Sequence, residues 1–302
     1  MNDDPSWLDR RDYPFLSRFV PLDGHVVHYV DEGEGPAILF LHGNPTWSFV
    51  YRRLVRELRG SFRCIALDYP GFGLSRAAAG YDFRPASHSA VVEKLVQRLE
   101  LRELTLFAHD WGGPIGLGAA SRMPDRFHAL VLGNTWAWPI DGDPHFERFS
   151  SFMGGPFGGW LIRNFNFFVN VMIPMGLRRG RLPAGVMRAY RGPFPTAQSR
   201  LPTHVFPREI RASSAFLREV ESGLARLRHL PLLLLWPDGD IAFRASERQR
   251  LEAVFPRHRT HVLANAGHYF QEEAFEECLA HFVAWWQEVG LGGKDRIVEM
   301  CA

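Results

Sequence analysis

The sequence predicts an α/β protein in which helices flank both faces of a mostly parallel sheet and a helical segment interrupts the alternation. Short apolar runs typical of strands alternate with helical patterns up to about residue 132 and again after residue 230. The stretch between them contains no clean strand. A strand, a crossover helix and a second strand form a parallel pair, so repetition of this unit predicts a parallel sheet between two layers of helices.

The first half of the chain contains most of the predicted strands. Residues 25–30 alternate like a half-exposed strand, whereas 37–41 are a continuous apolar run, as expected for a strand covered on both faces. The other strands predicted here are 63–67, 104–108 and 128–132, and the predicted helices are 48–58, 87–99 and 114–123. Each strand after residue 37 is thus separated from the next by a helical pattern.

Residues 135–228 are predicted to be a helical cap inserted into the core. This segment is rich in Phe, Trp, Pro and Gly, and prolines interrupt its helical stretches, of which 213–227 is one. Alternation then resumes with strands at 231–236 and 260–263 and helices at 245–255 and 273–288. We therefore expect a core built from residues 1–134 and 229–302, with the cap 135–228 over one end of the sheet.

The composition predicts an ordinary enzyme-sized globular protein. The chain has 302 residues, of which 46% are apolar and 23% charged, enough to bury a sizeable core. The net charge of +2, with scattered arginines, gives no support for a nucleic acid or membrane partner. The longest clear apolar run, residues 230–236, is far shorter than the ~20 residues needed to cross a bilayer.

The cysteines and the N-terminus predict a cytoplasmic location. Cys64, Cys278 and Cys301 are few, odd in number and without metal-ligand spacing, which favours free thiols in a reducing compartment. Residues 2–4 are Asn-Asp-Asp, which is unlike a signal peptide. The Gly-rich segment 68–75 lacks the lysine and spacing of a phosphate-binding loop, and no dinucleotide fingerprint is present. We therefore expect no cofactor and no metal.

Asp110 lies in a pattern typical of a nucleophile elbow. The segment Leu-Phe-Ala-His-Asp-Trp-Gly-Gly at 106–113 joins a buried strand directly to a helix, with small residues two before and two after Asp110. Small neighbours allow a strained turn that presents one side chain at the top of the sheet. Asp110 stands where many hydrolases have serine, and Ala108 replaces the first glycine. The alternative is that Asp110 only caps the following helix.

Three other loops supply possible partners for Asp110. Residues 42–45, His-Gly-Asn-Pro, follow the strand 37–41, and in this arrangement that loop donates a backbone N–H to an oxyanion. The strand 231–236 leads to two carboxylates, Asp238 and Asp240, and the loop 265–268 brings His268 in front of the last helix. The chain order Asp110, Asp240, His268 matches nucleophile, acid and base. Two other histidines, at 258 and 261, are expected at the surface.

Together these motifs resemble the haloalkane dehalogenases of the α/β-hydrolase superfamily. The resemblance rests on His-Gly-Asn-Pro at 42–45, Asp-Tyr-Pro-Gly-Phe-Gly-Leu-Ser at 68–75, Asp-Trp-Gly-Gly at 110–113 and Gly-His at 267–268. It extends from about Tyr13 to Glu288 and implies an α/β-hydrolase fold. The chain is most similar to the subgroup that combines a halide-binding Asn with an Asp acid after the later strand.

The resemblance assigns a role to each motif residue. Asp110 is the expected nucleophile, His268 the base and Asp240 its orienting acid, preferred over Asp238 because its offset from Trp236 fits the family pattern. The side chains of Asn44 and Trp111 are the expected halide ligands, and their backbone N–H groups the expected oxyanion donors. The implied partners are a small apolar halogenated substrate, water and halide, and the subgroup hints at a homo-oligomer. Another lineage has its acid after the preceding strand, where this chain has the neutral Asn134.

An aspartate suits displacement at carbon for a chemical reason. Its carboxylate forms an alkyl ester whose carbonyl can afterwards be hydrolysed, whereas a serine would form an ether with no carbonyl to attack. The departing halide needs fixed donors in an apolar pocket, which Trp111 and Asn44 offer as N–H groups. Phenylalanines of the insertion are available to line that pocket, namely Phe149, Phe152, Phe165, Phe167, Phe168 and Phe206.

Three alternatives stay open at this point. An epoxide hydrolase shares the Asp and His but usually takes two tyrosines from the insertion, which here holds only Tyr190. A fluoroacetate dehalogenase needs an arginine beside the nucleophile, where this chain has Trp111. A non-catalytic binding protein on a hydrolase scaffold usually lacks a member of the triad, and none is missing here.

Overall fold

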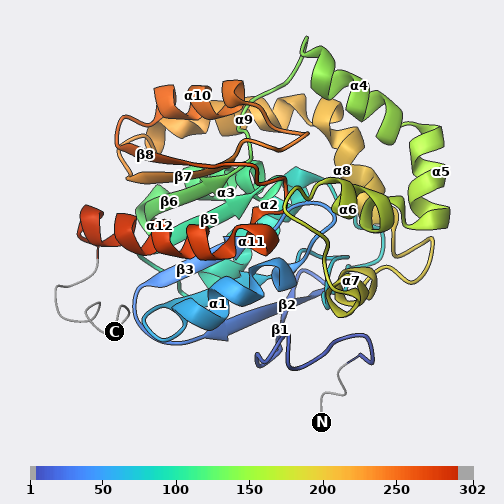
Figure 1. The fold of residues 1–302 in the computed structure, drawn as a ribbon, viewed down its shortest axis with the longest axis horizontal. Helices are drawn as coiled ribbons and strands as arrows, with labels where there is room; N and C mark the ends of the chain where they lie inside the picture. The colour runs from blue at the N-terminus through green and yellow to red at the C-terminus, as the bar shows by residue number, and fades with distance from the viewer. Residues whose placement is uncertain (1–4, 292–302) are drawn as a thin grey trace.

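An eight-stranded sheet forms the centre of the structure, in the order β1-β2-β4-β3-β5-β6-β7-β8 (Figure 1). The structure is a computed structural model that describes residues 5–291. Its strands are β1 Arg18–Leu22, β2 His25–Glu32, β3 Ala37–Leu41, β4 Arg63–Leu67, β5 Leu104–His109, β6 Phe127–Gly133, β7 Leu232–Pro237 and β8 His258–Leu263. All seven strands predicted from the sequence are confirmed, with ends shifted by at most two residues.

The eighth strand, β1, was not predicted. It pairs only with β2, in antiparallel register, and so forms one edge of the sheet. Its sequence, Arg-Phe-Val-Pro-Leu, contains Pro21, a residue that edge strands accept because one side of the strand needs no hydrogen-bonding partner. The β2–β4 pair is also antiparallel, and the pairs from β4 through β8 are parallel. The prediction of a mostly parallel sheet is therefore confirmed.

Helices cover both faces of the sheet. On one face α1 packs against β4 and α12 against β7 and β8, and on the other α2 packs against α3, which contacts β3 and β5. The helices outside the segment between β6 and β7 are α1 Arg52–Leu58, preceded by a turn of 3-10 helix at Ser48–Tyr51, α2 Pro85–Arg98, α3 Gly112–Arg122, α10 Ala245–Val254, α11 Phe270–Glu273 and α12 Phe275–Val289. The predicted helices correspond to these.

The chain between β6 and β7 is helical within the described residues. Its helices are α4 Pro144–Met153, α5 Pro156–Phe165, α6 Ile173–Met175, α7 Ala184–Arg191, α8 Leu201–Ala212 and α9 Ser214–Gly223. Figure 1 shows α4 to α8 gathered at one end of the sheet, whereas α9 returns to pack against α3. The proposed boundaries at 134/135 and 228/229 stay a prediction, and residues 292–302 of the second core segment lie outside the described residues.

The Gly-rich segment after β4 is organised by one buried carboxylate. Asp68 is fully buried and accepts a hydrogen bond from His28, whose Nδ1 lies 2.8 Å from Asp68 Oδ2. The same carboxylate accepts hydrogen bonds from the backbone N–H groups of Ser48 and Leu74, each at 2.8 Å. Its hydrogen bonds therefore connect β2, the segment that follows β3 and the Gly-rich turn. In this segment Asp68 stabilises the loop that lies behind the candidate site.

Removing the Asp68 carboxylate should destabilise the whole fold. Asp68→Ala leaves His28 and two backbone N–H groups buried without their acceptor, so we expect a loss of about 3 kcal/mol or more in the free energy of unfolding. Urea denaturation followed by circular dichroism measures this loss. The matched control is Asp125→Ala, an exposed carboxylate for which we expect almost no change. Equal stability of the two variants would contradict this account.

Candidate active site

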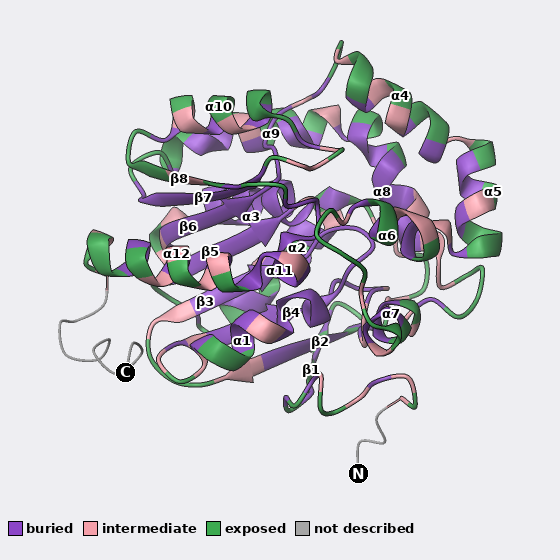
Figure 2. Cartoon of the chain, in the orientation of Figure 1, coloured by how far each residue is buried: buried purple, intermediate pink, exposed green. Residues whose placement is uncertain are grey.

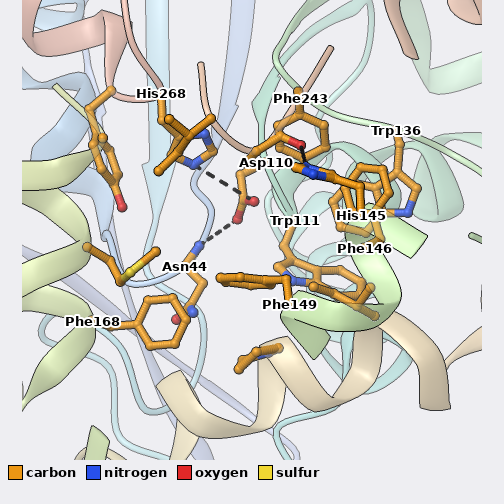
Figure 3. A pocket seen from close by; sticks show the side chains of 17 residues that line it. Asn44, Asp110, Trp111, Trp136, His145, Phe146, Phe149, Phe168, Phe243 and His268 are labelled. Atoms are coloured by element: carbon orange, nitrogen blue, oxygen red, sulfur yellow. Dashed lines mark hydrogen bonds and ion pairs between the residues drawn. The ribbon is translucent and has the colours of Figure 1, made fainter. Parts of the chain in front are cut away.

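Asp110 directly follows β5 and adopts a left-handed backbone conformation, with φ of +52°. A non-glycine residue in this conformation is strained and persists only when its surroundings hold it there. Here the Asp110 backbone N–H donates to the carbonyl of Asn134 at 3.1 Å. A Cβ atom at Gly112 would collide with the Leu41 carbonyl, and one at Gly113 with the Thr135 side chain. The two glycines therefore allow the sharp turn that directs the Asp110 carboxylate into the pocket (Figure 3).

Two backbone N–H groups hold the Asp110 carboxylate. The N–H of Asn44 donates to Asp110 Oδ1 at 2.8 Å, and the N–H of Trp111 also donates to the carboxylate. A Cβ atom at Gly43 would collide with this carboxylate, so the loop after β3 approaches it closely only because residue 43 is glycine. The structure thus places the backbone groups of Asn44 and Trp111 where the sequence predicted the oxyanion donors. Oδ2 of Asp110 points toward His268.

His268 is oriented by Asp240. Its Nδ1 lies 2.8 Å from Asp240 Oδ2, and the Asp240 side chain is completely buried. Asp240 also accepts hydrogen bonds from the backbone N–H of Ala242 at 2.6 Å and from Asn134 Nδ2 at 2.5 Å. The rival carboxylate, Asp238, is exposed and accepts instead from the backbone N–H of Asn265 at 2.6 Å. The structure therefore brings Asp240, and not Asp238, to His268.

The buried charges of the site shift each other's pKa values. Burial lowers the pKa of His268, but the negative charges of Asp240 and Asp110 outweigh it, and the pKa ends above its usual value. Burial raises the pKa of Asp240, yet His268, Ala242 and Asn134 together bring it below the usual value. For Asp110 burial dominates and raises the pKa, against the opposing effect of His268 and the two backbone N–H groups.

His268 does not hydrogen-bond directly to Asp110. Its Nε2 lies 4.0 Å from Asp110 Oδ2, beyond the range of a direct hydrogen bond. This spacing is suited to a water molecule that donates to the imidazole while its oxygen approaches the carboxyl carbon. Oδ2 therefore stays available as a nucleophile.

The side chains of Asn44 and Trp111 reach the same pocket (Figure 3). The indole of Trp111 packs edge-on against Trp136, with ring centroids 4.6 Å apart, and against Phe206 at 5.4 Å. Within residues 5–291, no acceptor lies within hydrogen-bonding distance of its indole N–H. The amide Nδ2 of Asn44 lies 3.3 Å from the carbonyl of Thr203 in α8, a contact that orients the carboxamide. Two N–H donors thus border the cavity in front of Asp110.

The cavity has a volume of about 140 Å³ and a mainly apolar lining. Of the predicted phenylalanines, Phe149 and Phe168 line it, while Phe206 is buried behind Trp111. Phe152 and Phe165 are 54% and 56% exposed, so the expectation that they were available to the pocket is wrong. Their helices α4 and α5 turn those positions outward. Phe167 packs instead with Met153 and Ile162 in a small separate cluster.

Several lining residues were not identified from the sequence. They are Trp136, His145, Phe146, Met172, Gly176, Pro207, Ile210, Ile241, Ala242, Phe243 and Tyr269. Three of these residues could have been found from their positions in the sequence. Trp136 follows the end of β6, Phe243 follows the loop that carries Asp240, and Tyr269 follows His268. All three therefore lie near the same edge of the sheet as the reactive residues. The lining residues in α4 and α8 had no such signal, because their inward direction depends on how these two helices are placed.

The lining of the cavity can be compared with what an epoxide hydrolase or a fluoroacetate dehalogenase would need. Tyr190, the only tyrosine of the insertion, is buried and donates a hydrogen bond from its hydroxyl to Glu272, and it is not among the lining residues. The lining also contains no arginine. Residues 258 and 261 lie in the edge strand β8, with His258 exposed and His261 half-buried against His281, in line with the predicted surface position.

The family comparison agrees with this architecture. Residues 36–275 match the family model described as alpha/beta hydrolase fold. Together with the strand order and the turn at Asp110, this match places the chain in the α/β-hydrolase class of enzymes.

Comparison with similar proteins identifies the family within this class. The chain is 40% identical to haloalkane dehalogenase 2 of Mycobacterium tuberculosis over 90% of this chain and 95% of that protein. It is 32% identical to a cis-3-alkyl-4-alkyloxetan-2-one decarboxylase of Shewanella oneidensis, over 89% of this chain and 87% of that protein. The crystal structure of a haloalkane dehalogenase from Bradyrhizobium elkani superposes with a TM-score of 0.82 at 26% identity, covering 92% of this chain and 98% of that one. The chain belongs to the haloalkane dehalogenase family.

The contact between Asp240 and His268 predicts how the pKa of His268 should respond when each of the two candidate acids is replaced. In the native protein we expect the pKa of His268 to lie above 6.5, and Asp240→Asn should lower it because the imidazolium loses its closest negative charge. Asp238→Asn should leave it unchanged. NMR titration of the imidazole protons measures this, with the His268 signal identified by its loss in His268→Phe. A larger decrease in Asp238→Asn would identify Asp238 as the orienting acid.

Proposed function

We propose that the protein hydrolyses haloalkanes to an alcohol and halide through a covalent ester on Asp110. The observation that carries this proposal is a carboxylate at the elbow with one oxygen held by backbone N–H groups and a second oxygen facing an apolar cavity bordered by two N–H donors. Asp110 is the proposed nucleophile, His268 the base, Asp240 its orienting acid, and Asn44 and Trp111 the halide and oxyanion donors.

In the first step, Asp110 Oδ2 attacks the carbon that carries the halogen. A carbon–oxygen bond forms, the carbon–halogen bond breaks, and the halide leaves with the electron pair. The backbone N–H groups keep Oδ1 in place, while the Trp111 indole N–H and the Asn44 amide stabilise the charge that develops on the halogen. The apolar lining keeps water away from these donors, which strengthens the interaction.

In the second step, His268 takes a proton from water, and the hydroxide attacks the carboxyl carbon of Asp110. The N–H groups of Asn44 and Trp111 hold the resulting oxyanion. Its collapse releases the alcohol and restores the carboxylate, so each turnover yields one alcohol, one halide and one proton. The ester also removes the charge of Asp110, one of the groups that raise the pKa of His268. The pKa of the imidazole therefore falls in the intermediate, which favours the neutral base that this step requires.

Loss of a halide donor should slow the first step. Asn44→Ala and Trp111→Phe each remove one N–H group from the cavity, and such a loss costs about 3 kcal/mol of transition-state stabilisation, or roughly a hundredfold in rate. Halide release from 1-bromobutane measures the effect. Trp286→Phe is the matched control, because it removes an indole N–H that is also buried without a partner in the described structure but belongs to α12 and does not line the cavity. Turnover unchanged in both donor variants would exclude this halide site.

A variant without the base tests the covalent mechanism. The Asp110 carboxylate needs no proton transfer to attack carbon, so His268→Phe should release at most one halide per active site and then stop. Intact-protein mass should increase by the alkyl group, and peptide mapping should place that group on Asp110. Multiple turnover by this variant, or an adduct on another residue, would contradict the mechanism.

The same variant distinguishes the epoxide hydrolase alternative. With styrene oxide, an epoxide hydrolase would trap a hydroxyalkyl ester on Asp110. Tyr269 is the tyrosine that lines the cavity among the described residues, and it comes from the core rather than from the insertion. A single tyrosine, with Asn44 and Trp111 opposite, is better suited to a departing halide than to an opening epoxide ring. Failure to trap styrene oxide is therefore expected.

A second candidate function follows from the decarboxylase relatives. Two proteins named cis-3-alkyl-4-alkyloxetan-2-one decarboxylase are each 32% identical to this chain. A carboxylate nucleophile in an apolar cavity can also attack a strained four-membered lactone ring. A cis-dialkyl β-lactone therefore belongs in the same assay as the haloalkanes. Loss of the lactone with release of CO₂, in the absence of halide release, would assign this second function.

The cytoplasmic location and the self-association expected from the sequence are kept here as proposals. No helix within residues 5–291 has the length and hydropathy that a bilayer crossing needs. Cys64 and Cys278 are buried free thiols, which supports the proposed cytoplasmic location, whereas Cys301 lies outside the described residues. The Asn-Asp-Asp sequence at 2–4, used to argue against a signal peptide, also lies outside them. Self-association stays a prediction.

A further inference from the structure

The charge of the chain is unevenly distributed. Residues 135–228 contain thirteen arginines, six acidic residues and no lysine, a net charge of +7 in a chain whose total is +2. Between α4 and the end of α8, at 144–212, the acidic residues are only Glu147 and Glu209, against ten arginines. Glu209 is buried, so it adds little negative charge to the surface. The small net charge of the whole protein therefore conceals a strongly basic cap.

The same part of the cap exposes a row of large aromatic side chains. Phe152, Phe157, Trp160 and Phe165, which we call the aromatic row, are each between 52% and 56% exposed. Their rings form a chain of contacts, with centroid distances of 5.7, 6.1 and 5.1 Å from one to the next. Figure 2 shows exposed positions along the outer sides of α4 and α5, at the edge of the molecule farthest from β8. A continuous exposed aromatic surface marks a binding site more often than isolated apolar residues do.

Arginines surround the aromatic row. Arg163 is three residues after Trp160 in α5, and Arg148 four residues before Phe152 in α4, so each shares a helix face with an aromatic residue. Arg200 donates to the backbone carbonyl of Arg163 at 2.8 Å, and Arg211 donates to Ser151 Oγ at 2.9 Å. The carboxylate on these two helices is Glu147, which accepts from the backbone N–H of Gly142.

We propose that α4 and α5 form a docking surface for an anionic lipid bilayer. Phe and Trp enter the boundary between headgroups and acyl chains, while surrounding arginines bind anionic headgroups. The proposal needs no membrane-spanning helix, because the protein would lie on the surface through its cap. It also does not depend on the chemistry proposed for Asp110.

Charge favours a bilayer over a second copy of the chain. A two-fold dimer through this surface would place two basic caps against each other, and like charges in an interface are repulsive. A polyanion alone would match the arginines but would leave the four aromatic rings without an apolar partner. An anionic bilayer satisfies both kinds of side chain.

The position of the surface connects it to the cavity. Arg148 and Phe152 of α4 are exposed, while His145, Phe146 and Phe149 of the same helix contribute to the cavity lining. One helix therefore separates the proposed lipid surface from the apolar pocket. An apolar compound dissolved in the bilayer would have only a short path to that pocket.

Vesicle flotation tests the proposal with the full-length protein. We expect binding to vesicles of phosphatidylcholine mixed with phosphatidylglycerol, release by added salt, and little binding to phosphatidylcholine alone. Arg148→Gln combined with Arg163→Gln should weaken binding by roughly five-fold for each arginine. Phe157→Ser combined with Trp160→Ser should also abolish most of it.

Matched controls separate this surface from general effects of charge and hydrophobicity. Arg98→Gln combined with Arg102→Gln changes the net charge equally on the core, and Phe19→Ser removes an exposed aromatic ring from β1. Both controls should bind like the native protein, and thermal unfolding by circular dichroism should show that all variants are folded. Equal binding by all variants, or no binding to anionic vesicles, would overturn the proposal. Native oligomers that dissociate in the Phe157/Trp160 variant would show that a second copy covers this surface instead.

Discussion

The geometry of the site depends on the left-handed backbone of Asp110. In this conformation the residue ends β5, begins α3 and directs its carboxylate away from the sheet. The turn is possible only because three close approaches occur at glycines: Gly43 against the carboxylate, Gly112 against the Leu41 carbonyl and Gly113 against Thr135. The backbone N–H groups that hold the carboxylate belong to Asn44 and Trp111, which stand next to these glycines. Nucleophile and oxyanion donors are therefore positioned by the same packing.

The second constraint is electrostatic. Asp110 and Asp240 lie on opposite sides of His268, and all three side chains are largely removed from water. Each carboxylate raises the pKa of His268 and so favours the protonated imidazole, whereas hydrolysis needs the neutral form. Ester formation on Asp110 lowers the pKa of His268, because the alkylated carboxyl has no charge. Asn134 donates a hydrogen bond to Asp240 and, being neutral, adds no further charge beside His268.

Core and cap contribute different properties to one cavity. The core supplies the reactive groups at the ends of β3, β5, β7 and β8, positions that parallel strands bring to one edge. The cap supplies much of the apolar wall through α4 and α8, and it carries a net charge of +7 in a chain whose total is +2. This division explains why the motifs lie outside 135–228, while the size of the cavity and the character of the surface depend on that segment.

The sequence by itself determined the fold class and the set of reactive residues. Continuous apolar strands show which segments are covered on both faces, and the parallel order brings Asn44, Asp110, Asp240 and His268 to one edge of the sheet. Small residues around Asp110 indicate a tight turn, because only small side chains permit it. The edge strand β1 escaped prediction, since its pairing with β2 depends on a partner rather than on its own pattern.

Only the tertiary structure decided how the cap faces the core. Phe149 and Phe152 are three residues apart in α4, yet one lines the cavity and the other is exposed, because the placement of the whole helix sets the inward side. The contact of Asp240, rather than Asp238, with His268 likewise forms only because the loop after β7 meets the loop that carries His268. Local patterns determine which residues can react or turn. Distances between segments far apart in the chain arise only when those segments pack together.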